Sequence, residues 1–301
     1  MMRMLLKVLG ILVSLIGVAL AVVLVPPHLQ ISKIEPSIPN ISELKKLTEG
    51  VDGPKGVRYL ITSSQQLPGA VLSHSSFILD WANGTSFIID VGMDQKEAIE
   101  FSKIMEYTGG AEPAIYHGNV AEILDEDIQA IKGMAFTHLH ADHTQGISVF
   151  CENVSGPVEA YQTGWQQKYH NFHTEDGAKL LANSCLTPVS LSGDKIHQLD
   201  KFPGLLAVGL GGHTPGSTLF AFSIDGMLYL LSGDITNSKN EILTNQGKGF
   251  VYSTFLVPEN TRRTEALRIW LAEVEAMIDV KVIVSHDLAD IEASGIPKYS
   301  K

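Results

Sequence analysis

The sequence predicts an α/β layered domain that follows an N-terminal membrane segment. Segments with the apolar, β-branched composition of strands alternate with segments of helical composition, which is the pattern of an α/β domain. Ahead of them lies an uncharged apolar run over residues 8–25, which is long enough to span a bilayer. Several predicted strands end in a His or an Asp, side chains that bind metal ions. The candidate functional residues therefore lie at strand ends.

Length and composition exclude some classes of protein. A chain of 301 residues with 45% hydrophobic and 18% charged residues can bury a full core, as one large domain or two small ones. The formal net charge is −11, and it becomes −13 when Arg3 and Lys7 of the leader are discounted. Such a charge repels a phosphate backbone, so we expect no nucleic-acid partner.

Residues 1–27 are predicted to be a transmembrane segment that acts as a signal anchor. Two basic residues precede the 18-residue apolar run, and Pro26-Pro27 is expected to end it. Because the positive flank stays in the cytoplasm, the rest of the chain should lie in the periplasm or the extracellular space. Ala19-Leu20-Ala21 offers a cleavage site, and cleavage would give a secreted protein. The uncleaved anchor is the preferred interpretation.

Residues 28–54 are predicted to be a linker, and residues 55–301 the folded domain. Prolines and a Gly-Pro pair interrupt regular structure in the linker, which contains one short helix around 42–47. The linker is expected to space the domain from the membrane.

The domain is predicted to begin with strands over 57–62, 70–79 and 85–91, with a hairpin turn at Asn83-Gly84. Asp90 stands near the end of the third strand. There it either caps the following turn or supports a metal ligand from behind.

Two helical segments follow, over 95–107 and 120–131. The first should bury one apolar face and end at Gly109-Gly110. The residues expected on this face are Ala98, Phe101, Ile104 and Met105.

A cluster of four ligand-type side chains follows a short apolar strand over 133–136. Its members are His138, His140, Asp142 and His143. Strand alternation should place His138 and His140 on one face, whereas the last two lie beyond the strand end and can turn toward the same cavity. Imidazole nitrogens with a carboxylate oxygen suit zinc, or another borderline divalent ion, at about 2.0 to 2.2 Å. The cluster therefore predicts a metal site.

Three further ligand-type residues stand at strand ends later in the chain. They are His213 after the strand 205–211, Asp234 after the hairpin 218–224 and 227–231, and His286 after the strand 280–284. A helix from its cap Asn260 to about Met277 should bury Leu267, Trp270, Leu271 and Val274. A strand over 158–161 and a helix over 162–171 are also predicted.

The remaining histidines and the cysteines lack ligand spacing. His74, His117, His170 and His173 are expected to pack or to lie at the surface, and the last two, with Trp165 and Tyr169, can also line a pocket. Cys151 and Cys185 are the entire cysteine complement, and neither has metal-motif spacing. Whether they pair is left open by the sequence.

Five separated motifs, in this order, resemble the metallo-β-lactamase-fold hydrolase superfamily. They are Asp90, the cluster that begins at His138, His213, Asp234 and His286, and the resemblance covers about residues 57–286. It implies an α/β fold in four layers, an αββα sandwich of the metallo-β-lactamase type, with the metals at one edge between two mixed sheets.

The resemblance also implies a site for two divalent metal ions, with zinc expected. The implied roles are His138, His140 and His213 on the first ion, Asp142, His143 and His286 on the second, Asp234 as the bridge, and Asp90 as a carboxylate that orients the ligand loop from behind. The chemistry of the residues agrees, because seven N and O ligands are too many for one tetrahedral zinc and enough for two ions that share a carboxylate.

The implied function is a dinuclear metal hydrolase that acts on a small ester, a lactone or a related molecule. A metal-bound hydroxide would attack the carbonyl, since a metal lowers the pKa of bound water toward about 7. Asp142 would act catalytically, by orienting this nucleophile or moving its proton. The expected partners are a small-molecule substrate and, through residues 1–27, a membrane.

Residues at single positions distinguish the subfamilies of this superfamily. True β-lactamases of this fold generally lack Asp at position 234, and flavodiiron oxidoreductases carry Glu where this chain has His140. Acyl-homoserine-lactone lactonases have Tyr three residues beyond the bridging Asp, where this chain has Asn237. Glyoxalase II enzymes carry a C-terminal helical region, whereas 15 residues follow His286. The alternatives are a mononuclear iron oxidoreductase similar to persulfide dioxygenases, a β-lactamase, and a binding protein without catalysis.

Overall fold

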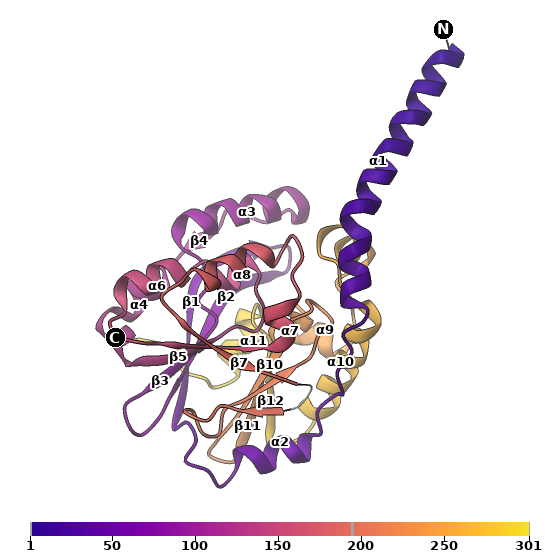
Figure 1. The fold of residues 1–301 in the computed structure, drawn as a ribbon. Helices are drawn as coiled ribbons and strands as arrows, with labels where there is room; N and C mark the ends of the chain where they lie inside the picture. Colours follow the sequence, from indigo (N-terminus) through magenta and orange to yellow (C-terminus); the bar gives the residue numbers. More distant parts are fainter. Residues whose placement is uncertain (1, 194–195, 301) are drawn as a thin grey trace.

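The computed structural model describes residues 2–193 and 196–300, and these residues form two mixed β-sheets with helices around them (Figure 1). The first sheet has the strand order β4-β1-β2-β3-β5-β6-β7, and the second has the order β12-β11-β10-β9-β8. The strands are β1 Gly56–Leu67, β2 Ala70–Asp80, β3 Ser86–Ile89, β4 Ile115–Tyr116, β5 Ile131–Ala135, β6 Glu159–Thr163, β7 Thr187–Leu191, β8 Ile196–Gln198, β9 Leu206–Gly209, β10 Thr218–Ile224, β11 Met227–Leu231 and β12 Val280–Ile283. The α-helices are α1 Met2–Ile31, α2 Ile41–Thr48, α3 Gln95–Gly109, α4 Val120–Leu124, α5 Ala141–Thr144, α6 Ile147–Asn153, α7 Gly164–Lys168, α8 Glu175–Ala182, α9 Lys239–Leu243, α10 Thr261–Glu275 and α11 Leu288–Ala293.

Both sheets combine antiparallel hairpins with parallel strands. In the first sheet β1, β2 and β3 are antiparallel neighbours, whereas β3, β5, β6 and β7 are parallel. In the second sheet β9, β10 and β11 are antiparallel and β12 joins β11 in parallel. Parallel neighbours need crossover connections, and helices supply them here. The predicted α/β class with mixed sheets is confirmed, as is the turn at Asn83-Gly84, where Gly84 has a φ of 80°.

Three apolar clusters hold the domain together. The first contains residues of both sheets, among them Phe77 and Phe87 of the first sheet and Phe220 and Phe222 of the second. The second cluster joins the first sheet to α4 and α6, and the third joins the second sheet to α2 and α10. Burial of apolar surface on both faces of each sheet is the main stabilising term of such a fold.

Some helix boundaries differ from the prediction. The segment 120–131 is helical only to Leu124, continues as the 3₁₀-helix Asp125–Ala130, and enters β5 at Ile131. Ile104, expected on the buried face of α3, is 58% exposed, because that face is formed by Ala98 and Ser102. Helix α7 covers only 164–168 of the expected 162–171.

Strand β7 was missed because it looks unlike a buried strand. It is an edge strand of the first sheet, pairs with β6 and with no other strand of the described residues, and contains Pro188. Proline has no N–H to donate to a ladder, so it is tolerated in a sheet only at such an edge. The strands β4 and β8 and the helices α8 and α11 are short and were also not predicted.

The N-terminal helix extends further than its sequence suggests. Helix α1 continues past the end of the apolar run and past Pro26-Pro27 to Ile31. The last turn packs on the domain, where Ile31 is buried and His28 Nε2 lies 3.1 Å from the carbonyl oxygen of Thr254. By length and composition, residues 3–31 form a helix able to cross a membrane, and the most apolar part of this helix is not buried by the domain.

Several residues of the segment 28–54 pack against the domain. Leu44 of α2 is fully buried in the cluster under the second sheet, and Thr48 Oγ1 lies 2.6 Å from Ser223 Oγ. Asn40 caps α2 by accepting a hydrogen bond from the Ser42 N–H. Within the segment expected as a linker, α2 therefore packs on the domain.

Cys151 and Cys185 form a disulfide that links the α6 helix to the segment before β7. The Cα atoms are 5.6 Å apart, within the usual range for a disulfide. The pairing that the sequence left open is thus decided by the fold.

Candidate metal centre

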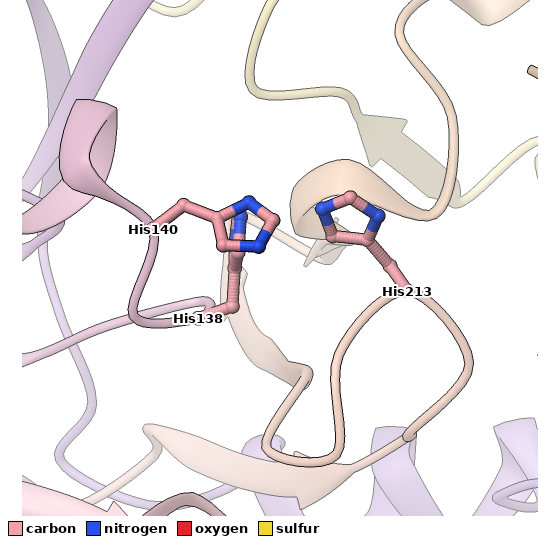
Figure 2. A group of neighbouring side chains, drawn as sticks. All are labelled: His138, His140 and His213. Carbon is pink, nitrogen blue, oxygen red and sulfur yellow. The ribbon is translucent and has the colours of Figure 1, made fainter. Parts of the chain in front are cut away.

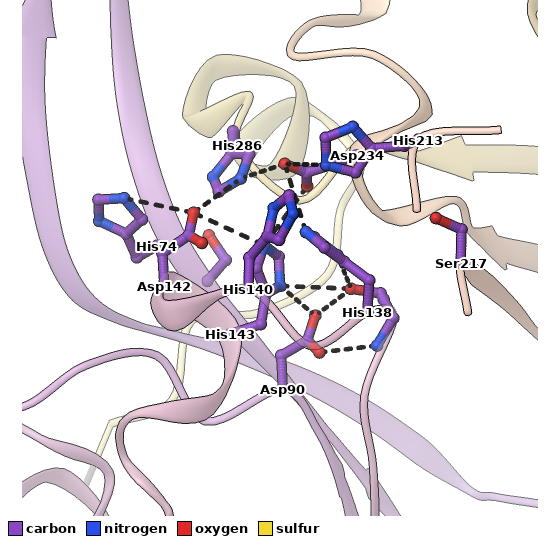
Figure 3. Close-up of polar contacts among 12 residues, drawn as sticks. His74, Asp90, His138, His140, Asp142, His143, His213, Ser217, Asp234 and His286 are labelled. Carbon is purple, nitrogen blue, oxygen red and sulfur yellow. Dashed lines mark hydrogen bonds and ion pairs between the residues drawn. The ribbon is translucent and has the colours of Figure 1, made fainter. Parts of the chain in front are cut away.

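All seven predicted ligand residues come together where several strands end (Figure 3). The ligand residues lie in the segments that follow four strands: His138 and His140 after β5, His213 after β9, Asp234 after β11, and His286 after β12. Asp142 and His143 lie on the short helix α5, which starts directly after His140.

The expectation that His138 and His140 alternate along a strand is wrong. Strand β5 ends at Ala135, and both residues belong to the loop between β5 and α5. The backbone N–H of Thr137 donates to Asp90 Oδ1 at 2.8 Å instead of to a neighbouring strand, and this bond stops the ladder. The loop still directs both imidazoles into the same site.

The first group consists of His138, His140 and His213 (Figure 2). One ligand atom from each lies within 4.8 Å of the others. The ring centroids are 4.4 Å apart for His138 and His140, and 4.8 Å apart from each of these to His213. The Nε2 atoms of all three are buried without a hydrogen-bond partner among the described residues. Three free nitrogens that face one another can hold a metal ion.

The second group consists of Asp142, His143, Asp234 and His286, all buried. The Nε2 atom of His286 lies 3.4 Å from Asp142 Oδ2 and 2.9 Å from Asp234 Oδ2. The Nε2 atom of His143 lies 3.7 Å from Asp142 Oδ2 and 3.5 Å from Asp234 Oδ1. Two imidazoles and two carboxylates therefore share a second small volume.

Asp234 lies between the two groups. Besides its contacts in the second group, its Oδ2 atom is 4.0 Å from His138 Nε2 and 3.8 Å from His213 Nε2. Among the described residues, Asp234 Oδ1 has no hydrogen-bond partner by the usual criteria, although it is buried. A carboxylate in this position can contact ions in both groups at once.

Asp90 lies outside the second group and holds the ring of one of its members, His143, in place. It has a φ of 61°, which is strained for a residue with a side chain, and it is fully buried. Its Oδ2 accepts from Thr137 Oγ1 at 2.8 Å and lies 2.9 Å from His143 Nδ1. Burial alone lowers the pKa of His143, but Asp90 and two other carboxylates raise it well above its usual value. The bond to Nδ1 leaves Nε2 of His143 free to face the site.

Glu259 supports the first group in the same manner, and nothing in the sequence pointed to this role. Its Oε1 lies 2.6 Å from His213 Nδ1, and its Oε2 accepts from Ser253 Oγ at 2.6 Å. The two members of the pair are 46 positions apart, and Glu259 belongs to no motif. Its only local signal is its place just before Asn260, the N-cap of α10.

The backbone carbonyl oxygen of Ser73 fixes the ring of His286 as the carboxylates fix those of His143 and His213. His286 Nδ1 lies 2.7 Å from Ser73 O, which fixes the ring with Nε2 toward the site. His74, the next residue on β2, is also buried, with its Nδ1 2.8 Å from Ser63 Oγ and its Nε2 3.9 Å from Asp142 Oδ2. His74 therefore borders the second group, a position that its sequence context did not indicate.

Lys248 is a further charged residue beside the site. Its side chain is 3% exposed, and Nζ lies 3.9 Å from Asp234 Oδ2 and 3.8 Å from Glu259 Oε1. The ammonium also lies 5.4 Å from the centre of the Tyr252 ring. The described structure gives Nζ no hydrogen bond, so its charge is balanced by the two carboxylates at longer range.

Burial and neighbouring charges set the protonation of the candidate ligands. Burial lowers the pKa values of His138 and His140 well below the usual value, and neighbouring histidines lower them further. Burial alone would raise the pKa of Asp234, but the nearby His286 and His138 hold it well below its usual value. Neutral imidazole and ionised carboxylate are the forms that bind metals.

Two glycines allow the ligand loops to approach closely. Gly233, next to Asp234, has a φ of 59°, and a Cβ there would lie 2.8 Å from Thr137 Cβ. A Cβ at Gly146 would lie 2.2 Å from the carbonyl oxygen of Val91. Such distances are far below van der Waals contact, so side chains at these positions would displace the loops.

The other histidines of the sequence lie in different surroundings. The His173 ring lies 5.7 Å from that of His140, at the rim of the site. His117 bonds Ser64 Oγ at 2.8 Å, and His170 bonds the Gln167 carbonyl at 3.0 Å. Among the described residues, neither His117 nor His170 belongs to the two groups of close ligand atoms.

The fold and the site together define a class of α/β proteins with convergent metal-binding His and Asp side chains. A family model described as the metallo-beta-lactamase superfamily matches residues 69–284, which is most of the chain. The chain belongs to the metallo-beta-lactamase superfamily, as the resemblance of its motifs indicated. Curated proteins give no match.

Solved structures share the fold at low identity. A mutant of AiiA from B. thuringiensis, with N-decanoyl-L-homoserine bound at the active site, has a TM-score of 0.61 and 15% identity, covering 80% of this chain and 96% of its own. A quorum-quenching N-acyl homoserine lactone lactonase has a TM-score of 0.59 and 14% identity, covering 80% and 95%. A probable metal-dependent hydrolase from Staphylococcus aureus has a TM-score of 0.52 and 15% identity, covering 79% and 91%.

Proposed function

We infer that the protein is a dinuclear metal-dependent hydrolase that cleaves a small ester, a lactone or a related bond. The observation that carries this proposal is the position of the Asp234 carboxylate. It lies within 4.0 Å of nitrogens of His138 and His213 on one side, and within 3.5 Å of nitrogens of His143 and His286 on the other. Two ions about 3.5 to 4 Å apart need such a shared anion.

The donor set fits two divalent ions, with zinc as the first choice. Nitrogen and oxygen donors without thiolates suit zinc and similar borderline ions. Buried polar atoms without a hydrogen-bond partner are costly, and a metal would satisfy them here. The atoms concerned are Nε2 of His138, His140, His143 and His213, and Oδ1 of Asp234.

The chain's own residues would position the reactants around the ions. Metal ions bound there would lower the pKa of water toward about 7 and polarise the scissile carbonyl. Asp142 is buried near His143 and His286, so its carboxylate is placed to orient the attacking water and accept its proton. Burial lowers the pKa of His74 to about 4, so this neighbour stays neutral and adds no charge beside Asp142.

The proposed substrate class is a lactone or another carboxylic ester. The structural neighbours named for N-acyl homoserine lactones share the fold with this chain at 14 to 15% identity, which supports the scaffold and leaves the substrate to be tested. The Asn237 N–H donates to Glu241 Oε2 at 2.7 Å, so Asn237 helps to begin α9. A lactonase-like reaction here would proceed without a Tyr at this position.

We also propose the four-layer arrangement and an exported location. The three apolar clusters support an αββα sandwich, because each joins adjacent layers. The apolar α1 supports residues 1–27 as a membrane anchor, and the Cys151–Cys185 disulfide supports an oxidising compartment for residues 55–301. Cleavage within the leader would instead release the domain.

Metal analysis with a substrate screen tests the function. The full chain in detergent is expected to retain about two zinc ions and to hydrolyse at least one member of a panel of lactones, thioesters, phosphodiesters, sulfate esters and β-lactams. One iron ion per chain, or two metal ions without hydrolysis of any ester, would overturn the proposal.

A reporter fused after Lys301 tests the location. We expect an enzyme that requires export, such as a periplasmic phosphatase, to be active in the fusion. Activity only of a reporter that works in the cytoplasm would contradict the proposed orientation.

A further inference from the structure

Exposed apolar side chains gather between the end of α1 and the candidate metal centre. We call this set the apolar rim; its members are Phe172, Phe250, Val251, Phe255 and Leu256. Phe250 is 74% exposed and Val251 64%. The ring centroids of Phe250 and Phe255 are 6.0 Å apart, so the rim includes an aromatic pair rather than only isolated side chains. Exposed apolar groups that lie together commonly mark an interaction surface.

The rim lies at the level where α1 leaves the apolar span. His28, in the last turn of α1, bonds the carbonyl of Thr254, which precedes Phe255. His28 is three residues beyond Val25, the end of the uncharged run, and three residues of helix rise about 4.5 Å. Figure 1 shows the orange-yellow segment of the chain beside the base of α1. With α1 across a bilayer, the rim would therefore lie at the membrane surface.

The rim also borders the entrance of the metal centre. Of the seven candidate ligands, six are buried and His140 alone is half-buried, so the site is most open on its side. The His173 ring lies 5.7 Å from the His140 ring, and His173 Nε2 contacts the carbonyl of Leu256. The Phe172 ring lies 4.2 Å from the His173 ring. Phe172 and Leu256 thus flank the open side of the site.

The inner side of the same segment contacts the ligands. Ser253 Oγ donates to Glu259, which holds His213, and the buried Lys248 lies near Asp234. Residues 248–259 therefore carry both polar contacts to the candidate metal centre and exposed apolar side chains of the rim.

From this arrangement we propose that the apolar rim inserts into the bilayer surface beside α1, and that the metal centre takes amphiphilic substrates with an apolar chain from the membrane. The occupant of the rim is the lipid bilayer, because α1 brings the rim to it. Aromatic and aliphatic side chains are the ones that enter the boundary between headgroups and acyl chains. The substrate part of this inference rests on the proposed hydrolase function.

Quenching by lipid tests the insertion without any enzymatic readout. The two native cysteines are paired, so a single bimane label can be placed at Phe250→Cys, with Ile278→Cys as the control. Ile278 is 95% exposed and follows α10 at the end away from its Asn260 cap. In vesicles of phosphatidylcholine with brominated acyl chains, we expect quenching at position 250 to be at least about threefold stronger than at 278.

The outcomes of this experiment distinguish membrane anchoring by α1 from insertion of the apolar rim. If the full chain floats with the vesicles but positions 250 and 278 are quenched equally, the proposed insertion of the apolar rim is overturned. Membrane anchoring by α1 is then still supported. A full chain that does not float with the vesicles overturns both.

The dependence of kcat/KM on the length of the substrate's acyl chain tests the proposed substrate class. In the same vesicles, Phe250→Ser with Phe255→Ser should lower kcat/KM for p-nitrophenyl decanoate about tenfold and leave p-nitrophenyl acetate nearly unchanged, because only the longer chain partitions into lipid. Ile278→Ser is the matched control and should change neither. An equal effect on both esters, with two metal ions retained, overturns the substrate part. If wild-type protein hydrolyses neither ester, the proposed function fails on these substrates, and the quenching result still decides the rim.

Discussion

Glu259 Oε1 lies 2.6 Å from His213 Nδ1, and on the other side of the metal centre Asp90 Oδ2 lies 2.9 Å from His143 Nδ1. Each group of candidate ligands thus has one histidine whose ring is fixed by a buried carboxylate. Such a bond sets the tautomer, turns Nε2 toward the candidate metal site and raises the basicity of the imidazole. This pairing leads to a prediction for each side of the centre.

Glu259→Gln should weaken metal binding at the group of candidate ligands that contains His213. The amide keeps the shape of the side chain but removes its charge, so we expect the affinity for one ion to fall about 10- to 100-fold. Competition with a chromophoric chelator measures both dissociation constants. Asp90→Asn is the matched variant on the other side and should weaken the ion beside His143 by a similar factor. Wild-type affinities in both variants would reduce these carboxylates to structural roles.

Asp234→Ala should affect both groups. A shared carboxylate offsets the repulsion between two cations, so we expect metal content to fall from about two ions to one or fewer. The value of kcat/KM should fall at least about 100-fold, equivalent to about 2.7 kcal/mol of transition-state stabilisation. Asp225→Ala, in the exposed turn between β10 and β11, is the control and should keep both metals. Two retained ions and a normal kcat/KM in Asp234→Ala would exclude the bridge.

Lys248→Met should bind metals more tightly than the wild-type protein. The buried ammonium lies 3.9 Å from Asp234 Oδ2, so it would repel cations bound at that carboxylate. Two unit charges interact by about 4 kcal/mol at about 4 Å and an effective dielectric constant of about 20, and by less at longer range. We expect at least a tenfold lower metal dissociation constant. With a chelator present, the variant should melt at a lower temperature, because Asp234 and Glu259 lose the lysine ammonium that lies within 4.0 Å of both carboxylates. Lys201→Met, at an exposed lysine, should change neither quantity. Weaker metal binding in Lys248→Met would contradict the repulsion argument.

Asp290→Asn should change how stability depends on pH. Burial, with the nearby Asp287 and Glu275, raises the pKa of Asp290 to about 6, although Lys239 opposes this shift. The folded protein then binds this proton more tightly than the unfolded chain, so this group lowers stability as pH rises from about 4 to about 6. In Asp290→Asn this loss should disappear.

Melting temperatures between about pH 4 and pH 7, with and without a chelator, measure the effect of Asp290→Asn. Asp176→Asn, at a side chain that is 82% exposed, is the control. The same pH dependence in Asp290→Asn and in the wild-type protein would show that another group causes the loss.

The sequence alone determined which side chains form the candidate metal centre. Ligand chemistry depends on residue type, and a His or Asp within a few residues of the end of a buried strand is placed by local structure, as His213, Asp234 and His286 show. The hairpin turn at Asn83-Gly84 and the Asn260 cap of α10 were predictable for the same reason, because each depends on residues close in sequence.

Only the tertiary structure decided the contacts that cross long distances in the chain. Glu259 reaches His213 over 46 positions, and the Ser73 carbonyl fixes His286 over 213. The pairing of Cys151 with Cys185 and the docking of His28 on Thr254 likewise depend on the packing of segments that are distant in the sequence. No local pattern encodes such pairs, because they form only when the buried apolar faces of both sheets bring distant segments together.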